Sequence, residues 1–145
     1  MTTRSLTWTD DLTLGIDDID REHRGLMEVV NEILVACDSG LDSAMLGALF
    51  AQLRKASLAH FAREERMLAD TLYPRLTQHR QEHAELIEQL DRIGAQAVRE
   101  AEHGGVADAT VIFLRHWLTS HIVGPDRGYS GYVKGREKRI RGGAE

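Results

Sequence analysis

Apolar residues recur every three to four positions in four parts of the chain, and short polar or glycine-containing breaks separate these parts. This spacing predicts amphipathic helices over residues 20–37, 43–72, 74–103 and 108–124. Asp108 is expected to cap the last helix, and Gly124 with Pro125 is expected to end it. Because each helix must bury its apolar face, the pattern predicts an all-α fold, an antiparallel up-down-up-down four-helix bundle.

The ends of the chain lack this periodicity. The first dozen residues are expected to form an N-terminal arm, with Trp8 packed on the bundle. Residues 134–145, "KGREKRIRGGAE", are expected to form a short, mildly basic and flexible C-terminal tail. The sequence thus predicts one domain over residues 1–133, followed by that tail.

The composition of the chain argues against several classes of function and of metal site. The net charge of −5 and the isoelectric point near 5.8 argue against binding to nucleic acid or to an anionic membrane surface. No apolar run has the length of a signal peptide or a membrane span, so we expect a cytoplasmic protein. Cys37 is the only cysteine, which excludes a disulfide within the chain and any cysteine-based metal cluster. A metal would need nitrogen and oxygen ligands.

Histidines interrupt the apolar stripes of all four predicted helices. One buried histidine is most simply explained by hydrogen bonds to its neighbours. Five on inner faces are harder to explain in this way, because the four helices would bring them together. They are His23, His60, His79, His83 and His121.

A buried carboxylate adds to this argument. Glu64 lies on the same face as His60, and a carboxylate in an apolar core costs several kcal/mol unless a cation or strong donors compensate it. One helical turn separates His60 from Glu64 and His79 from His83, so each pair can reach one centre. Asp126 follows the Gly-Pro break and could turn back toward this centre or simply form the turn. A metal site is the economical interpretation.

The remaining candidates have simpler explanations. His116 and His103 are expected on the surface, and Cys37 is expected to be a small buried apolar residue. Trp117 and Leu118 are most simply core residues. The charges of "REER" at 63–66, Glu64 excepted, most simply solvate the outside of their helix.

The number of donors predicts two metal ions. Two six-coordinate irons offer about twelve positions, and five imidazoles, two bridging carboxylates and one bridging oxo or hydroxo group fill all but one of them. The open position would belong to the ion that holds fewer histidines. Imidazoles and carboxylates also bind zinc, but zinc prefers fewer ligands and has no redox chemistry.

Four segments together resemble the hemerythrin family, especially its single-domain bacterial members. They are "GIDDIDREH" at 15–23, "HFAREE" at 60–65, "YPRLTQHRQEH" at 73–83 and "WLTSHIVGPDRGY" at 117–129, with Trp8 and Asn31 nearby. The resemblance covers about residues 8–132. The family usually has Gln before the first ligand histidine, where this chain has Glu22.

The resemblance implies a role for each residue. His79, His83 and His121 would bind one iron, His23 and His60 the other, and Glu64 and Asp126 would bridge the two. It also implies that Trp117 and Leu118 line an oxygen pocket, and that Tyr129 lies near the bridging carboxylates. Members of the family bind O2 reversibly at the iron with the open position.

We therefore expect an oxygen carrier, store or local donor rather than an enzyme, with O2 as ligand and an oxygen-consuming acceptor protein as a further partner. A di-iron redox enzyme, such as an oxidase, peroxidase or nitric-oxide reductase, would use the same ligands. So would an oxygen or redox sensor that signals through a separate partner. A purely structural bundle ranks last because it leaves Glu64 without a partner. We expect a monomer.

Overall fold

The computed structural model describes residues 5–40 and 42–143, with side chains through residue 136. Every regular element in these ranges is helical. The elements, in chain order, are η1 (Asp10–Leu12), α1 (Asp17–Ser39), α2 (Ser43–Asp70), α3 (Leu76–Glu102), α4 (Asp108–His121), η2 (Ile122–Asp126) and α5 (Arg127–Gly143).

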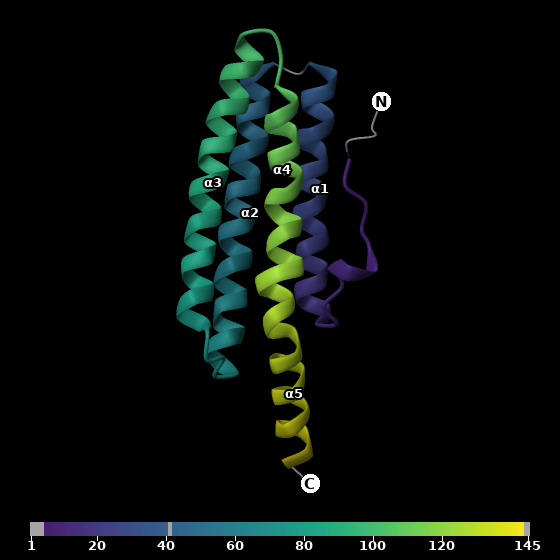
Figure 1. Ribbon diagram of the computed structural model, residues 1–145, viewed down its shortest axis with the longest axis vertical. Coiled ribbons are helices and arrows are strands. Elements are labelled where there is room, and N and C mark those ends of the chain that lie inside the picture. Colours follow the sequence, from purple (N-terminus) through teal and green to yellow (C-terminus); the bar gives the residue numbers. More distant parts are fainter. Residues whose placement is uncertain (1–4, 41, 144–145) are drawn as a thin grey trace.

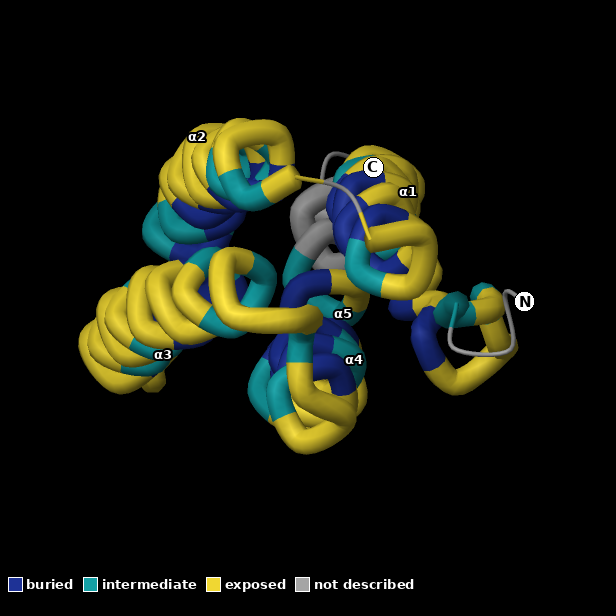
Figure 2. The backbone as a smooth tube through the Cα atoms, turned by 90° about the horizontal axis from the view of Figure 1, so that it is seen from above, coloured by how far each residue is buried: buried dark blue, intermediate teal, exposed yellow. Residues whose placement is uncertain are grey.

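The helices α1 to α4 lie side by side in an antiparallel bundle, and α5 continues the line of α4 beyond it (Figure 1). Seen from above, the buried parts of these helices face one another and the exposed parts face outward (Figure 2). The predicted all-α, antiparallel four-helix architecture is confirmed. In the described part of the chain, no helix is both long enough and apolar enough to cross a membrane.

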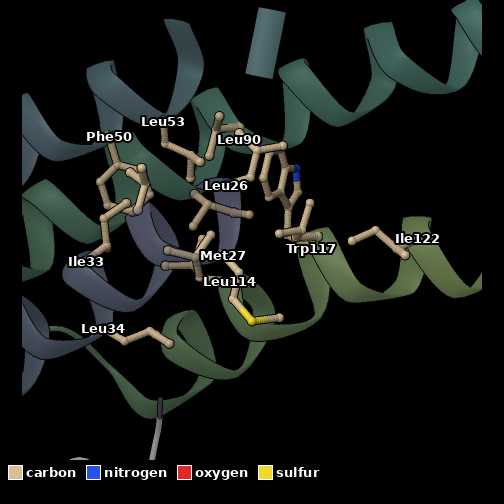
Figure 3. Packing of buried hydrophobic residues seen from close by; sticks show 14 of the residues in the cluster. Leu26, Met27, Ile33, Leu34, Phe50, Leu53, Leu90, Leu114, Trp117 and Ile122 are labelled. Carbon is tan, nitrogen blue, oxygen red and sulfur yellow. The ribbon is translucent and has the colours of Figure 1, made fainter. Parts of the chain in front are cut away.

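Apolar side chains fill the half of the bundle away from α5. Leu26, Ile33, Leu53, Leu90 and Leu114 come from all four helices and are almost completely buried (Figure 3). Their stripes follow the helical repeat, so each helix presents a continuous apolar face to its neighbours. This packing fixes the distance between helices and thus positions the residues further along the same faces.

Local signals set several helix boundaries. Gly40 adopts the left-handed conformation, with φ of 70°, that commonly ends a helix, and Asp42 accepts a hydrogen bond from the Met45 amide at the start of α2. The predicted boundaries of α1, α2 and α3 hold to within about three residues. Pro74 lies in the turn before α3, and Ala107, not Asp108, is the N-cap of α4, so the predicted Asp108 cap is wrong.

The predicted helix end at Gly124 and Pro125 is also wrong. The chain passes through these residues as the π-helical segment η2 and continues as α5. A wider π turn accommodates a proline that would clash with the preceding turn of a regular α-helix. The backbone of the proposed tail is therefore helical as far as Gly143, while its separation from the domain as a flexible segment stays a prediction.

The N-terminal arm packs along α1 (Figure 1). Trp8 contacts the apolar cluster and carries the Arg24 guanidinium 4.8 Å from its ring centre, which confirms its predicted packing. Further along the arm, the Asp20 carboxylate accepts hydrogen bonds from the amides of Leu14 and Gly15. These contacts hold the start of α1 next to the end of the bundle that carries the polar residues.

Candidate metal centre

A group of seven polar side chains lies between the helices at the α5 end of the bundle. All seven are at least 93% buried, although each is charged or capable of carrying charge. They come from all four bundle helices and η2: His23 on α1, His60 and Glu64 on α2, His79 and His83 on α3, His121 on α4 and Asp126 on η2. The structure thus brings together every predicted ligand.

One side of this group has three imidazoles. Glu64 Oε1 lies 2.7 Å from His79 Nε2 and 2.9 Å from His83 Nε2. Asp126 Oδ1 lies 3.0 Å from both His79 Nε2 and His121 Nε2. One oxygen of each carboxylate therefore faces this set of three nitrogens.

The other side has two imidazoles. Glu64 Oε2 lies 3.2 Å from His60 Nε2 and 3.7 Å from His23 Nε2. Asp126 Oδ2 lies 3.1 Å from His23 Nε2. The second oxygen of each carboxylate faces this pair, so both carboxylates lie between two separate sets of nitrogens. That is the arrangement of two bridging ligands.

The η2 segment explains how Asp126 reaches this position. Asp126 follows His121 by five positions, which on a regular α-helix would place the two side chains about 140° apart. In a π turn, residues i and i+5 lie one above the other. The π-helical turn over Ile122–Asp126 therefore puts the Asp126 carboxylate and the His121 imidazole on the same face.

Several of these buried atoms make no hydrogen bond of suitable geometry, despite the short distances between them. They are both ring nitrogens of His23, the Nε2 atoms of His60 and His121, and Asp126 Oδ1. Orphaned polar atoms in a core cost free energy comparable to a lost hydrogen bond. Because they converge on two centres with imidazole and carboxylate donors, the residues present fit two metal ions with a preference for nitrogen and oxygen.

Without a metal, the imidazoles and carboxylates stabilise one another's charges. Burial alone lowers the pKa of His23 and of His79, but the neighbouring Asp126 and Glu64 carboxylates outweigh burial and raise both values to about 9. Burial likewise opposes ionisation of Glu64 and Asp126, yet the surrounding imidazoles hold the pKa of each carboxyl below its ordinary range. The carboxylates are therefore ionised and available to cations.

Tyr129 on α5 contacts the Glu64 carboxylate. Its hydroxyl donates a hydrogen bond of 2.9 Å to Glu64 Oε2, and its side chain is completely buried. Burial and the charges of Glu64 and Asp126 raise the pKa of this phenol, so the hydroxyl keeps its proton and acts as a donor. Tyr129 therefore lies beside the carboxylate that faces both sets of imidazoles.

The Phe61 ring packs on the imidazoles of α3 and α4, and buried apolar residues precede His121 on α4. Phe61 stacks on His83 with a centroid distance of 3.9 Å and an interplanar angle of 7°. Trp117 is buried and donates a hydrogen bond to the Leu86 carbonyl, and Leu118 next to it is buried as well. A cavity of about 620 Å³ between α3 and α4 is lined in part by Trp117 and His121, and so reaches the edge of the polar group.

Other polar residues were expected to lie outside the metal site, and the structure shows where each of them lies. His116 and His103 are exposed, as predicted, whereas Cys37 is only half-buried against the apolar cluster. The interpretation of Glu65 as a solvating charge is wrong, because Glu65 lies 2.7 Å from His83 Nδ1. Glu22 Oε1 likewise lies 2.6 Å from His60 Nδ1. Both contacts join neighbouring helices, and no periodicity within one helix predicts them.

Comparison with known proteins decides the family. The profile of the hemerythrin HHE cation binding domain matches residues 14–133, which is most of the chain. The chain belongs to the hemerythrin family. Hemerythrins bind O2 at a non-haem di-iron centre and are not enzymes, and the same holds for this protein.

Individual hemerythrins agree with this assignment. The chain is 32% identical to a bacteriohemerythrin of Stenotrophomonas maltophilia over 129 residues, which cover 89% of this chain and 82% of that one. It is also 32% identical to a myohemerythrin of Riftia pachyptila over 124 residues, covering 86% and 90% of the two chains. A crystal structure of wild-type hemerythrin superposes with a TM-score of 0.73, at 23% identity, over 88% of this chain and 97% of that chain, which shows the common fold.

Proposed function

We propose that His79, His83 and His121 hold one iron, that His23 and His60 hold the other, and that Glu64 and Asp126 bridge the two. A single observation carries this assignment. Each carboxylate turns one oxygen to the set of three imidazoles and the other oxygen to the set of two. When bound, the iron pair supplies the redox-active positions at which the family binds O2 reversibly.

The side chains around the centre would orient the iron ligands and keep water away from bound O2. Nε2 is the ring nitrogen that faces the centre in all five histidines, so each ring can offer the same kind of donor. Tyr129 orients Glu64 through its hydroxyl group. Buried Phe61, Trp117 and Leu118 would exclude water from the neighbourhood of bound O2. Exclusion of water and protons favours release of O2 over its reduction.

The physiological role that these features support is an oxygen carrier, store or local donor. The cavity between α3 and α4 reaches His121 and Trp117, which would allow a small ligand to approach the centre from outside. A protein that accepts the oxygen, a cytoplasmic location and a monomeric state remain predictions from the sequence.

Iron analysis of matched variants tests the ligand assignment. The protein should bind two irons per chain, and His60→Ala or Glu64→Ala should lower this number. His116→Ala should leave it unchanged, because His116 is exposed on the outer face of α4. Loss of iron in His116→Ala, with normal iron content in His60→Ala, would overturn the assignment.

Oxygen binding needs a separate test. The iron-loaded protein is reduced without air, exposed to O2 and then returned to an oxygen-free atmosphere. A visible absorption band that appears with O2 and disappears when O2 is removed supports a carrier. Irreversible bleaching with continued consumption of a reductant would instead indicate the redox enzyme.

A further inference from the structure

Two histidines of the centre carry an acidic partner on their outer nitrogen. Glu22 Oε1 lies 2.6 Å from His60 Nδ1, and Glu65 Oε2 lies 2.7 Å from His83 Nδ1. Because Nε2 of each ring faces the centre, Nδ1 is the nitrogen that carries the proton and donates it to the carboxylate. Both glutamates are about a quarter exposed, so they lie between the buried imidazoles and the surface.

Each of these carboxylates also has an arginine on its other oxygen. Arg63 Nε donates to Glu22 Oε2 at 2.5 Å, and Arg80 Nε lies 3.3 Å from Glu65 Oε1. The chain therefore builds the same series twice, arginine to carboxylate to imidazole, and each series joins two helices. Glu22 on α1 meets α2, and Glu65 on α2 meets α3.

The other inner histidines with a described Nδ1 environment differ. His23 Nδ1 is buried and has no hydrogen-bond partner among the described residues. His79 Nδ1 lies 3.8 Å from Glu82 Oε2, which is too far for a hydrogen bond. The short carboxylate contact is thus a particular property of His60 and His83, one from each of the two sets of imidazoles.

We propose that Glu22 and Glu65 are positioning residues that fix the tautomers of His60 and His83 and make these two imidazoles stronger electron donors to the metals than His23 or His79. This inference rests on the proposed function, because it takes His60 and His83 as ligands. A carboxylate that accepts the Nδ1 proton raises the basicity of the ring and fixes its orientation. The set of two imidazoles gains one such ligand, and so does the set of three.

The arginines oppose the effect of the glutamates and weaken electron donation by these imidazoles. Arg63 draws negative charge away from the imidazole by holding the second oxygen of Glu22. Removal of Glu22 should therefore weaken donation by His60, and removal of Arg63 should strengthen it. A purely structural role of this ion pair would instead give both variants the same defect, since either substitution breaks the pair.

The first experiment compares Glu22→Gln with Arg63→Gln in the iron-loaded protein. Glu22→Gln should raise the reduction potential of the iron pair and weaken metal affinity by about tenfold, measured by competition with a chelator. Arg63→Gln should lower the potential. Glu28→Gln and Arg66→Gln remove similar charges from exposed positions on the same two helices and control for simple Coulomb effects. Shifts of the same sign in Glu22→Gln and Arg63→Gln, or shifts no larger than in these controls, would overturn the proposal.

The second experiment observes the hydrogen bonds directly. Nuclear magnetic resonance of the zinc-loaded, ¹⁵N-histidine-labelled protein should show strongly downfield Nδ1 protons for His60 and His83, and not for His23. Glu22→Gln should move only the His60 proton, and Glu65→Gln only that of His83. Unchanged proton shifts in both variants would contradict the inference.

The two proposals fail in different ways. If the unaltered protein does not bind two irons, the ligand assignment itself is wrong. If it binds two irons and Glu22→Gln changes neither the potential, the affinity nor the His60 proton, only the role of the outer carboxylates is wrong.

Discussion

The two halves of α2 use the same helical face for different purposes. In the first half, Leu46, Phe50 and Leu53 fill the apolar end of the bundle, and in the second half His60 and Glu64 occupy the equivalent positions at the polar end. The apolar end is stable through burial alone, since its side chains need no partner beyond one another. The polar end is complete only with cations between its donors. The comparison shows how a bundle holds a reactive centre on a rigid support.

Removal of the metal should cause the largest loss of stability, and the loss should be greater at the polar end of the bundle than at the apolar end. A ligand that binds only the folded state at a concentration about 1,000 times its dissociation constant stabilises by about 4 kcal/mol. We therefore expect the iron-free protein to unfold at much lower denaturant concentration than the iron-loaded protein. Hydrogen exchange should accelerate at the α5 end of the bundle more than around Leu53. Equal acceleration at both ends would contradict the proposed division.

Leu53→Ala should weaken the apolar end without changing the chemistry of the polar end. The side chain is completely buried, so its truncation should cost about 3 kcal/mol of unfolding free energy. The loss should be similar with and without iron, and iron content should stay at the level of the unaltered protein. Leu58→Ala is the matched control on α2, because Leu58 is 44% exposed and its truncation should change stability little.

The iron-free protein should lose stability as pH rises. The pKa of His23 and of His79 is raised to about 9 in the folded state, above the ordinary value of about 6.5 in the unfolded chain. The resulting stabilisation is fully present below about pH 6.5 and is lost as pH rises through 9, by an amount on the order of 3 kcal/mol for each imidazole.

Denaturation of the iron-free and iron-loaded forms across this pH range measures the effect. In the iron-loaded form the metal replaces the proton on each imidazole, so this decline should be absent. A decline of equal size in both forms would show that other groups cause it.

Tyr129→Phe should have the smallest effect of these changes. It removes a hydrogen bond to the charged Glu64 carboxylate, which should cost about 1.5 kcal/mol and alter the absorption spectrum of the iron pair. Tyr132→Phe is the control, because the Tyr132 hydroxyl donates to the backbone carbonyls of Thr71 and Leu72, away from the centre. An identical spectral change in both variants would argue against a specific role for Tyr129.

Much of the fold could be predicted from the sequence because the apolar residues follow the helical repeat so regularly. The same repeat placed His60 and Glu64 on one face and His79 and His83 on another, and the bundle geometry then brings these faces together. The exposure of His116 followed from the same reasoning. Periodicity is informative here because a buried polar residue is rare enough to stand out.

What could not be predicted depends on contacts between helices or on local departures from regular geometry. The π turn at Gly124 and Pro125 has the sequence of a helix end, yet tertiary packing carries the chain through it into α5. This turn decides where the Asp126 carboxylate lies. Glu22 and Glu65 look like surface charges on their own helices, and only the approach of a neighbouring helix gives them a histidine partner.

The most direct test of the ligand assignment is the location of iron by anomalous X-ray scattering in crystals of the iron-loaded protein. Two peaks should lie in the polar end of the bundle, one beside His79, His83 and His121 and the other beside His23 and His60, with Glu64 and Asp126 in contact with both. A single peak, or iron bound away from these seven side chains, would contradict it.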